Sequence, residues 1–206
     1  TLVTAFSVLI GLGTAANYNL LIGAKKKDEA ARFAGNAVSL AVIVGIVLMA
    51  LSLVFLEPML LLFGATENVL PFALDYTSIT AIGIPFLLFS TAMSYIIRSD
   101  GSPHFSMMMI ATGAVLNIGL DALFMLVFGW GIMGSAAATT ISQVVSAIIT
   151  VFYLHRFKNV SLTRETMRLR WNTIKPMVKL GISYFFYQFA TMLSQVVLNN
   201  ALTTYG

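Results

Sequence analysis

The 206-residue chain contains no cysteine and few charged residues, and both shortages narrow what it can be. Without cysteine, disulfide frameworks, thiolate nucleophiles, iron–sulfur clusters and cysteine-containing zinc sites are excluded. Charged residues make up 10% of the chain and hydrophobic residues 58%, whereas soluble proteins carry about 25% charged residues. A soluble fold could not cover its surface with so few charges. The composition therefore indicates an integral membrane protein.

Both ends of the sequence lie in apolar stretches. It opens with Thr1-Leu2-Val3 and no basic region, so the first apolar stretch is not expected to be a signal peptide. It closes at Tyr205-Gly206, directly after another apolar run. We interpret the chain as an internal piece of a longer polypeptide.

Six stretches are predicted to cross the membrane as helices. A spanning helix needs about 20 mostly apolar residues, because the hydrocarbon core is about 30 Å thick. Turn and breaker residues separate the stretches, and none shows the sustained alternation that a membrane strand requires. The predicted fold is all-α, a polytopic transmembrane helical bundle. Its six membrane segments are residues 1–23, 35–56, 71–97, 105–128, 134–155 and 181–206.

The basic residues predict the orientation of these segments. All twelve lie in or beside alternate separators: four after the first segment, one after the third and seven after the fifth. The separators around 57–70 and 129–133 contain none. Under the positive-inside rule, the basic separators are cytoplasmic. The net charge of +4 then needs no nucleic-acid partner, because these residues are topology signals near anionic lipid. Cytoplasmic loops are thus expected at 24–34, 98–104 and 156–180, with residues 1 and 206 outside.

The separator at 156–180 is longer than the others. It is interpreted either as a surface linker with a short amphipathic helix or as a hinge between two helical bundles. In both cases it is a candidate boundary, which divides the chain into residues 1–155, 156–180 and 181–206.

Asp121 differs from the other acidic residues because it lies well inside a predicted membrane helix. The others lie among lysines, in loops or near a helix start, and Asp100 is expected in a turn. A charged Asp at a helix centre costs about 2.5–3.5 kcal/mol, so it should face the bundle interior or a cavity. Asn117 lies four residues earlier on the same helix face. Thr139, on the next helix, is expected at a depth within about 3 Å of Asp121.

Two interpretations of these three residues remain open. Amide, carboxylate and hydroxyl oxygens meeting in a dry site suit a monovalent cation, or a proton on the carboxylate. Burial favours the neutral acid and a bound cation favours the anion, so occupancy would switch the charge of the site. Alternatively, Asp121 is hydrogen-bonded to Asn117 and Thr139 only to hold the helices together.

Other polar residues within the predicted helices are weaker candidates. Gln143 lies in an alanine-rich helix, which is typical of close helix packing but also compatible with a substrate pathway. Three amides on the last helix, Gln188, Gln195 and Asn199, could line an aqueous cavity. Pro85 should kink the third helix and is a candidate hinge.

Several motifs together resemble the multidrug and toxic compound extrusion (MATE) transporters. The first is Asn117-x-x-x-Asp121 followed by FGWGIMGSAAAT at 128–139. The others are IGAK at 22–25, GIPFLL at 83–88, RSDGSP at 98–103 and NNALTTYG at 199–206. The resemblance covers essentially the whole chain, and it rests on the order and spacing of these motifs.

The resemblance implies an architecture and a site. Members have twelve helices in two six-helix lobes joined by a long cytoplasmic loop. By this match the chain carries the second to seventh helices: 1–155 is most of the N-terminal lobe, 156–180 the inter-lobe loop, and 181–206 the first helix of the C-terminal lobe. Asn117, Asp121 and Thr139 match the cation site of the first lobe, whose remaining carboxylate lies on the family's first helix. Some branches place an acid on the seventh helix, but residues 181–206 contain none.

The implied function is export of drugs or other cationic or amphipathic organic compounds, coupled to inward flow of Na⁺ or H⁺, in the plasma membrane. Its partners would be the lipid bilayer, the substrate and the remainder of its own chain. No catalytic residue, no cofactor and no metal other than Na⁺ at the three matched residues is expected. The alternatives are a lipid-linked oligosaccharide flippase of the same superfamily, which should have basic residues deep in its cavity, and a non-transporting membrane scaffold.

Overall fold

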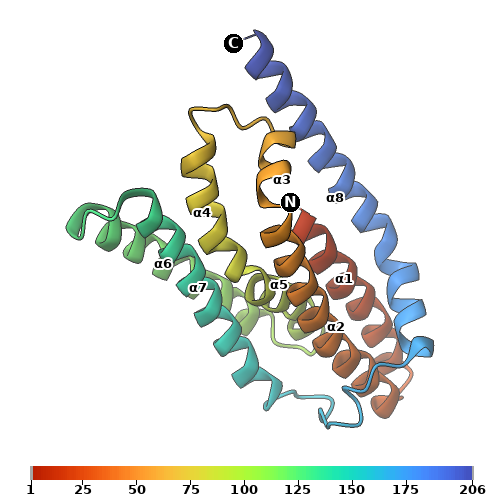
Figure 1. The fold of residues 1–206 in the computed structure, drawn as a ribbon. Helices are drawn as coiled ribbons and strands as arrows, with labels where there is room; N and C mark the ends of the chain where they lie inside the picture. Colours follow the sequence, from red (N-terminus) through yellow and green to blue (C-terminus); the bar gives the residue numbers. More distant parts are fainter. Residues whose placement is uncertain (1, 206) are drawn as a thin grey trace.

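A computed structural model describes residues 2–205 and the side chains of residues 2–201, and every regular element in this range is a helix (Figure 1). The ends at residues 1 and 206, predicted to face outside, lie beyond the described residues. The elements are α1 (Leu2–Gly23), α2 (Lys27–Val54), α3 (Leu56–Leu62), α4 (Leu70–Ile82), α5 (Ile84–Ser99), α6 (Pro103–Ala122), the π-helical turn η1 (Leu123–Val127), α7 (Gly131–Leu154) and α8 (Trp171–Tyr205).

The six predicted segments correspond to α1, α2, α4 with α5, α6 with η1, α7, and α8. Within the described residues, α1, α2, α6 with η1, and α7 are long and apolar enough to cross a membrane. The bent pair of α4 and α5 would make a fifth span. α8 has 35 residues, more than a bilayer requires, although it does not reach the apolar composition of the other spans.

Two predicted loops are shorter than expected because charged residues were interpreted as helix breakers. The loop predicted at 24–34 ends where α2 begins at Lys27. Asp28 and Glu29 lie in the first turn of α2, where negative charge favours a helix. The loop predicted at 156–180 ends where α8 begins at Trp171. In addition, the outer separator at 57–70 contains most of the short helix α3.

The first turns of α8 are helical despite Pro176 because they pack on α1. Thr173, Met177 and Gly181 are spaced four residues apart and are all buried, whereas Lys175 and Lys179 on the other face are exposed. A Cβ on Gly181 would overlap the Leu9 carbonyl of α1. The backbones of α1 and α8 therefore touch, which only glycine permits.

The third predicted segment is broken into two helices. α4 and α5 meet at Gly83 with an angle of 54°. Pro85 lies in the first turn of α5, where its missing N–H costs nothing to α5 but deprives α4 of a donor. Gly45 of α2 packs directly on Pro85, since a Cβ there would lie 2.7 Å from the Pro85 Cα. The bend therefore sits on the backbone of α2.

The buried core lies where α1, α2 and α5 meet. α1 contributes Tyr18, the largest fully buried side chain among the described residues, and α5 contributes Leu88, Met93, Ile96 and Ile97. Alanines of α2 face them and allow close approach of the helices. By contrast, α6 and the outer half of α8 expose large apolar side chains, as expected of surfaces that face lipid or further protein.

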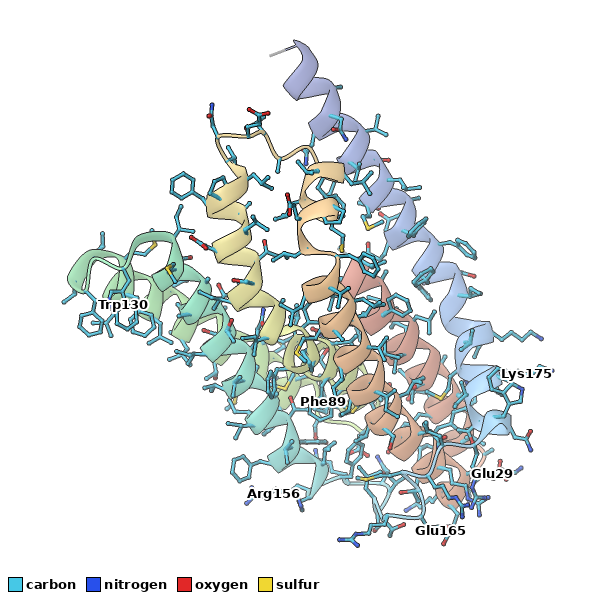
Figure 2. The ribbon with its side chains drawn as sticks, viewed as in Figure 1. Glu29, Phe89, Trp130, Arg156, Glu165 and Lys175 are labelled. Carbon is cyan, nitrogen blue, oxygen red and sulfur yellow. The ribbon has the colours of Figure 1, made fainter. Side chains whose placement is uncertain are left out.

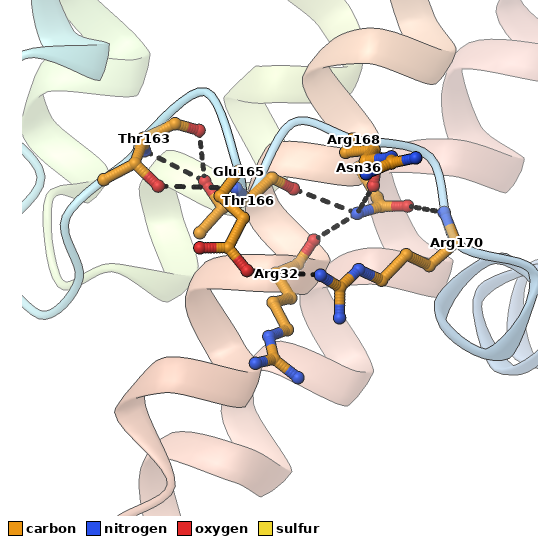
Figure 3. Close-up of polar contacts among 7 residues, drawn as sticks. All are labelled: Arg32, Asn36, Thr163, Glu165, Thr166, Arg168 and Arg170. Carbon is orange, nitrogen blue, oxygen red and sulfur yellow. Dashed lines mark hydrogen bonds and ion pairs between the residues drawn. The ribbon is translucent and has the colours of Figure 1, made fainter.

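The connection between α7 and α8 is fastened to α2 by a buried amide (Figure 3). Asn36 Nδ2 donates to the carbonyls of Thr166 at 3.0 Å and Arg168 at 3.1 Å. Its Oδ1 accepts from the Arg170 backbone N–H at 2.8 Å. One residue before Asn36, Gly35 leaves room for the Thr166 backbone. Asn36 thus satisfies three backbone groups of a loop that has no secondary structure to do so.

The loops predicted to be cytoplasmic gather at one end of the bundle. In Figure 2, Glu29, Arg156 and Glu165 lie at the lower end, and Trp130 lies at the far tip of the α6–α7 hairpin. Phe124 and Phe128 stack around Trp130, with ring centroids 5.0–5.9 Å apart. Aromatic clusters of this kind are enriched at membrane–water interfaces. The arrangement is consistent with the predicted orientation.

Candidate cation site

α6 and α7 form an antiparallel hairpin that brings two of the three predicted site residues into contact. The Nδ2 atom of Asn117 on α6 donates to the Oγ1 of Thr139 on α7 at 3.4 Å. This distance is at the long end for an N–H···O bond, whose usual value is about 2.9–3.0 Å. Asn117 and Thr139 therefore lie at the same depth in the helix pair. Their hydrogen bond is weak enough for the Asn117 or Thr139 side-chain oxygen to bind another group.

Asp121 lies one turn beyond Asn117, toward the outer end of α6. It is half-buried, and its Oδ1 atom is buried with no hydrogen-bond partner in the described part of the chain. The π-helical turn η1 begins two residues later, and such turns occur often at functional sites. The structure therefore places Asp121 in the helix pair of Asn117 and Thr139 without pairing it to either by a hydrogen bond. The expectation that Asp121 binds both neighbours as a simple staple is not what the contacts show.

Gln143 is the predicted pathway residue that lies near this site. It is one turn from Thr139, toward the end of α7 that is predicted to be cytoplasmic, and it shares a cavity with Asn117 and Thr139. Its Oε1 is the other buried side-chain oxygen that lacks a partner within the described residues.

The other three predicted pathway residues lie elsewhere. Gln188, Gln195 and Asn199 are on α8, which packs mainly against α1, on the opposite side of the molecule from α6 and α7 (Figure 1). Gln188 is half-buried, and Gln195 and Asn199 are exposed. The structure thus divides the predicted polar residues into two groups. Only the first group lies in the same helix pair, α6 and α7, as Asp121.

A second carboxylate, at Asp100, is completely buried. The sequence predicted only that it lies in a turn, and it does follow α5 directly. Its oxygens accept hydrogen bonds from Tyr18 Oη at 2.7 Å, Tyr153 Oη at 2.8 Å and the Lys158 N–H at 2.7 Å. Asn159 adds its backbone N–H and its Nδ2, each at 3.1 Å. Asp100 therefore joins α1, α5, α7 and the following loop at the end of the bundle that is predicted to be cytoplasmic.

No pattern in the sequence pointed to this cluster. Tyr18 and Tyr153 lie 82 and 53 residues from Asp100 along the chain. Each is an ordinary residue for a helix end near a membrane interface. The one local signal was an acidic residue in a Gly- and Pro-containing turn, which is common in turns of every kind. Groups of three or more acidic, His or Cys side chains that could hold a metal ion are absent from the described residues.

The all-helical bundle with a polar site between membrane helices is the architecture of a polytopic membrane transporter. The MatE family model matches residues 1–123 of the chain. The chain belongs to the multidrug and toxic compound extrusion (MATE) family, whose members are transporters.

Individual relatives agree with this assignment. The FAD transporter of Shewanella oneidensis is 30% identical over 183 residues, which cover 84% of this chain and 40% of that protein. The multidrug export protein MepA of Staphylococcus saprophyticus is 25% identical over 199 residues, covering 96% and 44%. The chain thus spans less than half the length of these relatives.

Solved structures share the fold. An inward-facing multidrug resistance MATE family transporter superposes with a TM-score of 0.90 at 24% identity, over 97% of this chain and 46% of that one. A crystal structure of a MATE transporter in the bent conformation gives a TM-score of 0.89 at 25% identity, over 100% and 46%. The arrangement of α1 to α8 is therefore that of part of a MATE transporter.

Proposed function

We propose that the chain carries the coupling site of a cation-driven antiporter that exports organic compounds across the plasma membrane. The observation that carries the proposal is the Asp121 Oδ1 atom, which is buried one turn from Asn117 and Thr139 and has no hydrogen-bond partner among the residues that the structure describes. A buried carboxylate oxygen without a donor is costly. Binding of Na⁺ or H⁺ would remove that cost, whereas a residue retained only to join helices would use its oxygens in hydrogen bonds. This supports ion exchange over the scaffold alternative.

Alternating access follows if the cation binds the outward-open and inward-open arrangements with different affinities. A ligand shifts such an equilibrium only by the difference between the two affinities. Asp121 lies two residues before the π-helical turn η1, and Asn117, one turn earlier on α6, makes only a long hydrogen bond of 3.4 Å to Thr139 of α7. These are features that a small ion could rearrange. The ion is cargo of the transport cycle, and no resident cofactor is required.

The substrate class we propose is cationic or amphipathic organic compounds. The cavity between α5, α6 and α7 is lined by neutral residues, among them Asn117, Thr139 and Gln143. Such a lining offers no counter-charge for the phosphates of a flavin nucleotide, although the Shewanella relative is named a FAD transporter. A lipid-linked oligosaccharide, with its pyrophosphate, is disfavoured for the same reason.

The test is efflux of ethidium by the full-length protein reconstituted in vesicles, with an imposed Na⁺ or pH gradient. Asp121→Asn should abolish gradient-driven efflux while the protein remains inserted and folded. Asp75→Asn is the matched control, because Asp75 is an exposed acid of α4. Ethidium efflux by Asp121→Asn at the native rate would disprove the coupling role. Efflux of FAD in place of ethidium would overturn the substrate class.

A further inference from the structure

A cavity of about 380 Å³ extends from the candidate cation site toward the cytoplasm, between α5, α6 and α7. Asn117 and Thr139 line its outer end. Met109 lines it eight residues before Asn117, and Ser146 lines it seven residues after Thr139. At a rise of about 1.5 Å per residue, the cavity reaches roughly 10–12 Å inward from the Asn117–Thr139 contact. Hydroxyl groups recur along its length, from Ser90, Thr91, Ser94, Ser142 and Ser146.

Gln143 lies within this cavity, and its carboxamide oxygen has a defined place. The Oε1 atom is buried and has no hydrogen-bond partner in the described residues. It lies against Gly83 at the bend between α4 and α5, where a Cβ would overlap it. The missing side chain of Gly83 therefore creates the space that the amide oxygen occupies.

Two unpartnered oxygens thus lie on opposite sides of the Asn117–Thr139 contact. Asp121 is one helical turn to its outer side and Gln143 is one turn to its cytoplasmic side, which separates them by about 12 Å along the helix axes. That is far more than two metal–oxygen distances of about 2.5 Å each, so one ion cannot bind both. Each oxygen can nevertheless coordinate a cation at its own depth in the membrane. Oxygen ligands from amides and hydroxyls suit hard cations.

We infer that Gln143 is a second, inner binding station for Na⁺, through which the coupling ion passes from Asp121 toward the cytoplasm. The inference rests on the proposed antiport function and specifies its ion and its route. The inner station contains amide and hydroxyl oxygens and no carboxylate. Neutral oxygens of this kind coordinate a metal cation but do not take up a proton near neutral pH. The chemistry of the station therefore selects Na⁺ over H⁺.

Two hydrogen bonds lie at the inner end of this route. Ser94 lines the cavity, and its carbonyl accepts a hydrogen bond from the buried Ser106 hydroxyl at 3.1 Å. The Arg98 Nε donates to the same hydroxyl at 3.1 Å. These bonds join α5 to α6 just beyond the cavity. Release of the ion to the cytoplasm then requires α5 and α6 to separate at Ser94 and Ser106.

The test measures two properties of the full-length protein: equilibrium binding of ²²Na⁺ in detergent, and ²²Na⁺ exchange across reconstituted vesicles. Gln143→Leu keeps the size of the side chain and removes its oxygen. It should leave equilibrium binding at Asp121 intact and slow exchange by about tenfold or more, because it removes the intermediate station and not the site. Asn172→Leu is the control, since Asn172 is an exposed amide at the start of α8, and it should exchange at the native rate.

A second variant protects the test against misfolding of the first. Gly83→Ala does not change residue 143 but puts a methyl group where the Gln143 Oε1 atom lies, so that this oxygen must move. It should reproduce the slow exchange, and Gln143→Glu, which keeps an oxygen, should restore the rate.

Three outcomes would contradict these proposals, each in a different part. Native exchange by Gln143→Leu, together with its loss in Asp121→Asn, would leave the antiport function standing and remove only the station. Substrate efflux driven by a pH gradient in the complete absence of Na⁺ would overturn the choice of ion. Native exchange in Asp121→Asn as well would overturn both proposals.

Discussion

Asp100 and Asp121 each have a buried carboxylate oxygen, and their surroundings are opposite. Asp100 is fully buried, and its two oxygens accept five hydrogen bonds from four residues. Asp121 is half-buried, and one of its oxygens is enclosed without any partner among the described residues. The first is the more buried and the better satisfied. The second has unused bonding capacity.

This difference separates a structural role from a binding role. A buried charge is tolerated when hydrogen bonds replace the lost water, and Asp100 meets that condition with donors from three parts of the chain. An acid held in place by five donors cannot accept an ion without breaking bonds. Asp121 can do so at no such loss. From the sequence, Asp121 was the candidate binding residue because it lies deeper in the membrane. The contacts support the same choice for another reason: Asp121 has an oxygen free to bind a ligand, and Asp100 does not.

The largest effect on stability is expected from Asp100→Ala. It leaves Tyr18, Tyr153 and the N–H groups of Lys158 and Asn159 without an acceptor, which should lower the free energy of unfolding by about 3–5 kcal/mol. The measurement is thermal unfolding of the full-length protein in detergent, with the exposed Asp75→Ala as control. A melting temperature equal to that of the control would show that the cluster does not stabilise the cytoplasmic end.

A smaller effect is expected from Tyr153→Phe, which removes a single hydrogen bond of 2.8 Å to Asp100. A bond to a charged group contributes about 1.5–3 kcal/mol, so a loss near the lower end is expected because four other donors remain. The same change made in the Asp100→Ala background should cost almost nothing, since the acceptor is already gone. Equal losses in both backgrounds would mean that Tyr153 acts through packing alone.

The smallest effect on stability is expected from Asp121→Asn. The Oδ1 atom accepts no hydrogen bond from the part of the chain that the structure describes, so the stability without Na⁺ should change by no more than about 0.5 kcal/mol. Added Na⁺ should stabilise the wild type more than the variant, because the variant lacks the carboxylate that binds the ion and ligand binding to the native state raises its stability. A loss as large as that of Asp100→Ala would remove the contrast between the two acids.

Much of the fold could be predicted because it depends on composition and local pattern. Apolar length and the positions of Lys and Arg indicated six helical segments, and the bend between α4 and α5 lies at Gly83, two residues before Pro85. The starts of α2 and α8 could not be predicted from polarity. Lys27 and Trp171 begin helices whose charged residues point outward while their other faces pack on neighbouring elements, which is tertiary information.

The candidate site was predictable in part for the same reason. Helical spacing placed Asn117 and Asp121 on one face, and matching depths brought Thr139 to Asn117. The sequence could not show that Gln143 belongs with them and that Gln188, Gln195 and Asn199 do not, because that depends on which helices are neighbours. Their roles in a substrate pathway stay predictions, as does the role of Pro85 as a hinge.

The connection from His155 to Arg170 has a further consequence. Fully extended, sixteen residues could span about 50 Å, enough for α7 and α8 to move far apart. Instead, hydrogen bonds hold it near both ends. Asp100 accepts from the backbone N–H groups of Lys158 and Asn159, and Asn36 accepts from the N–H of Arg170. The connection is therefore fixed at both of its ends. The start of α8 is therefore held in a set position relative to α1 and α2, so any movement between these helices must occur within the helices and not in the connection.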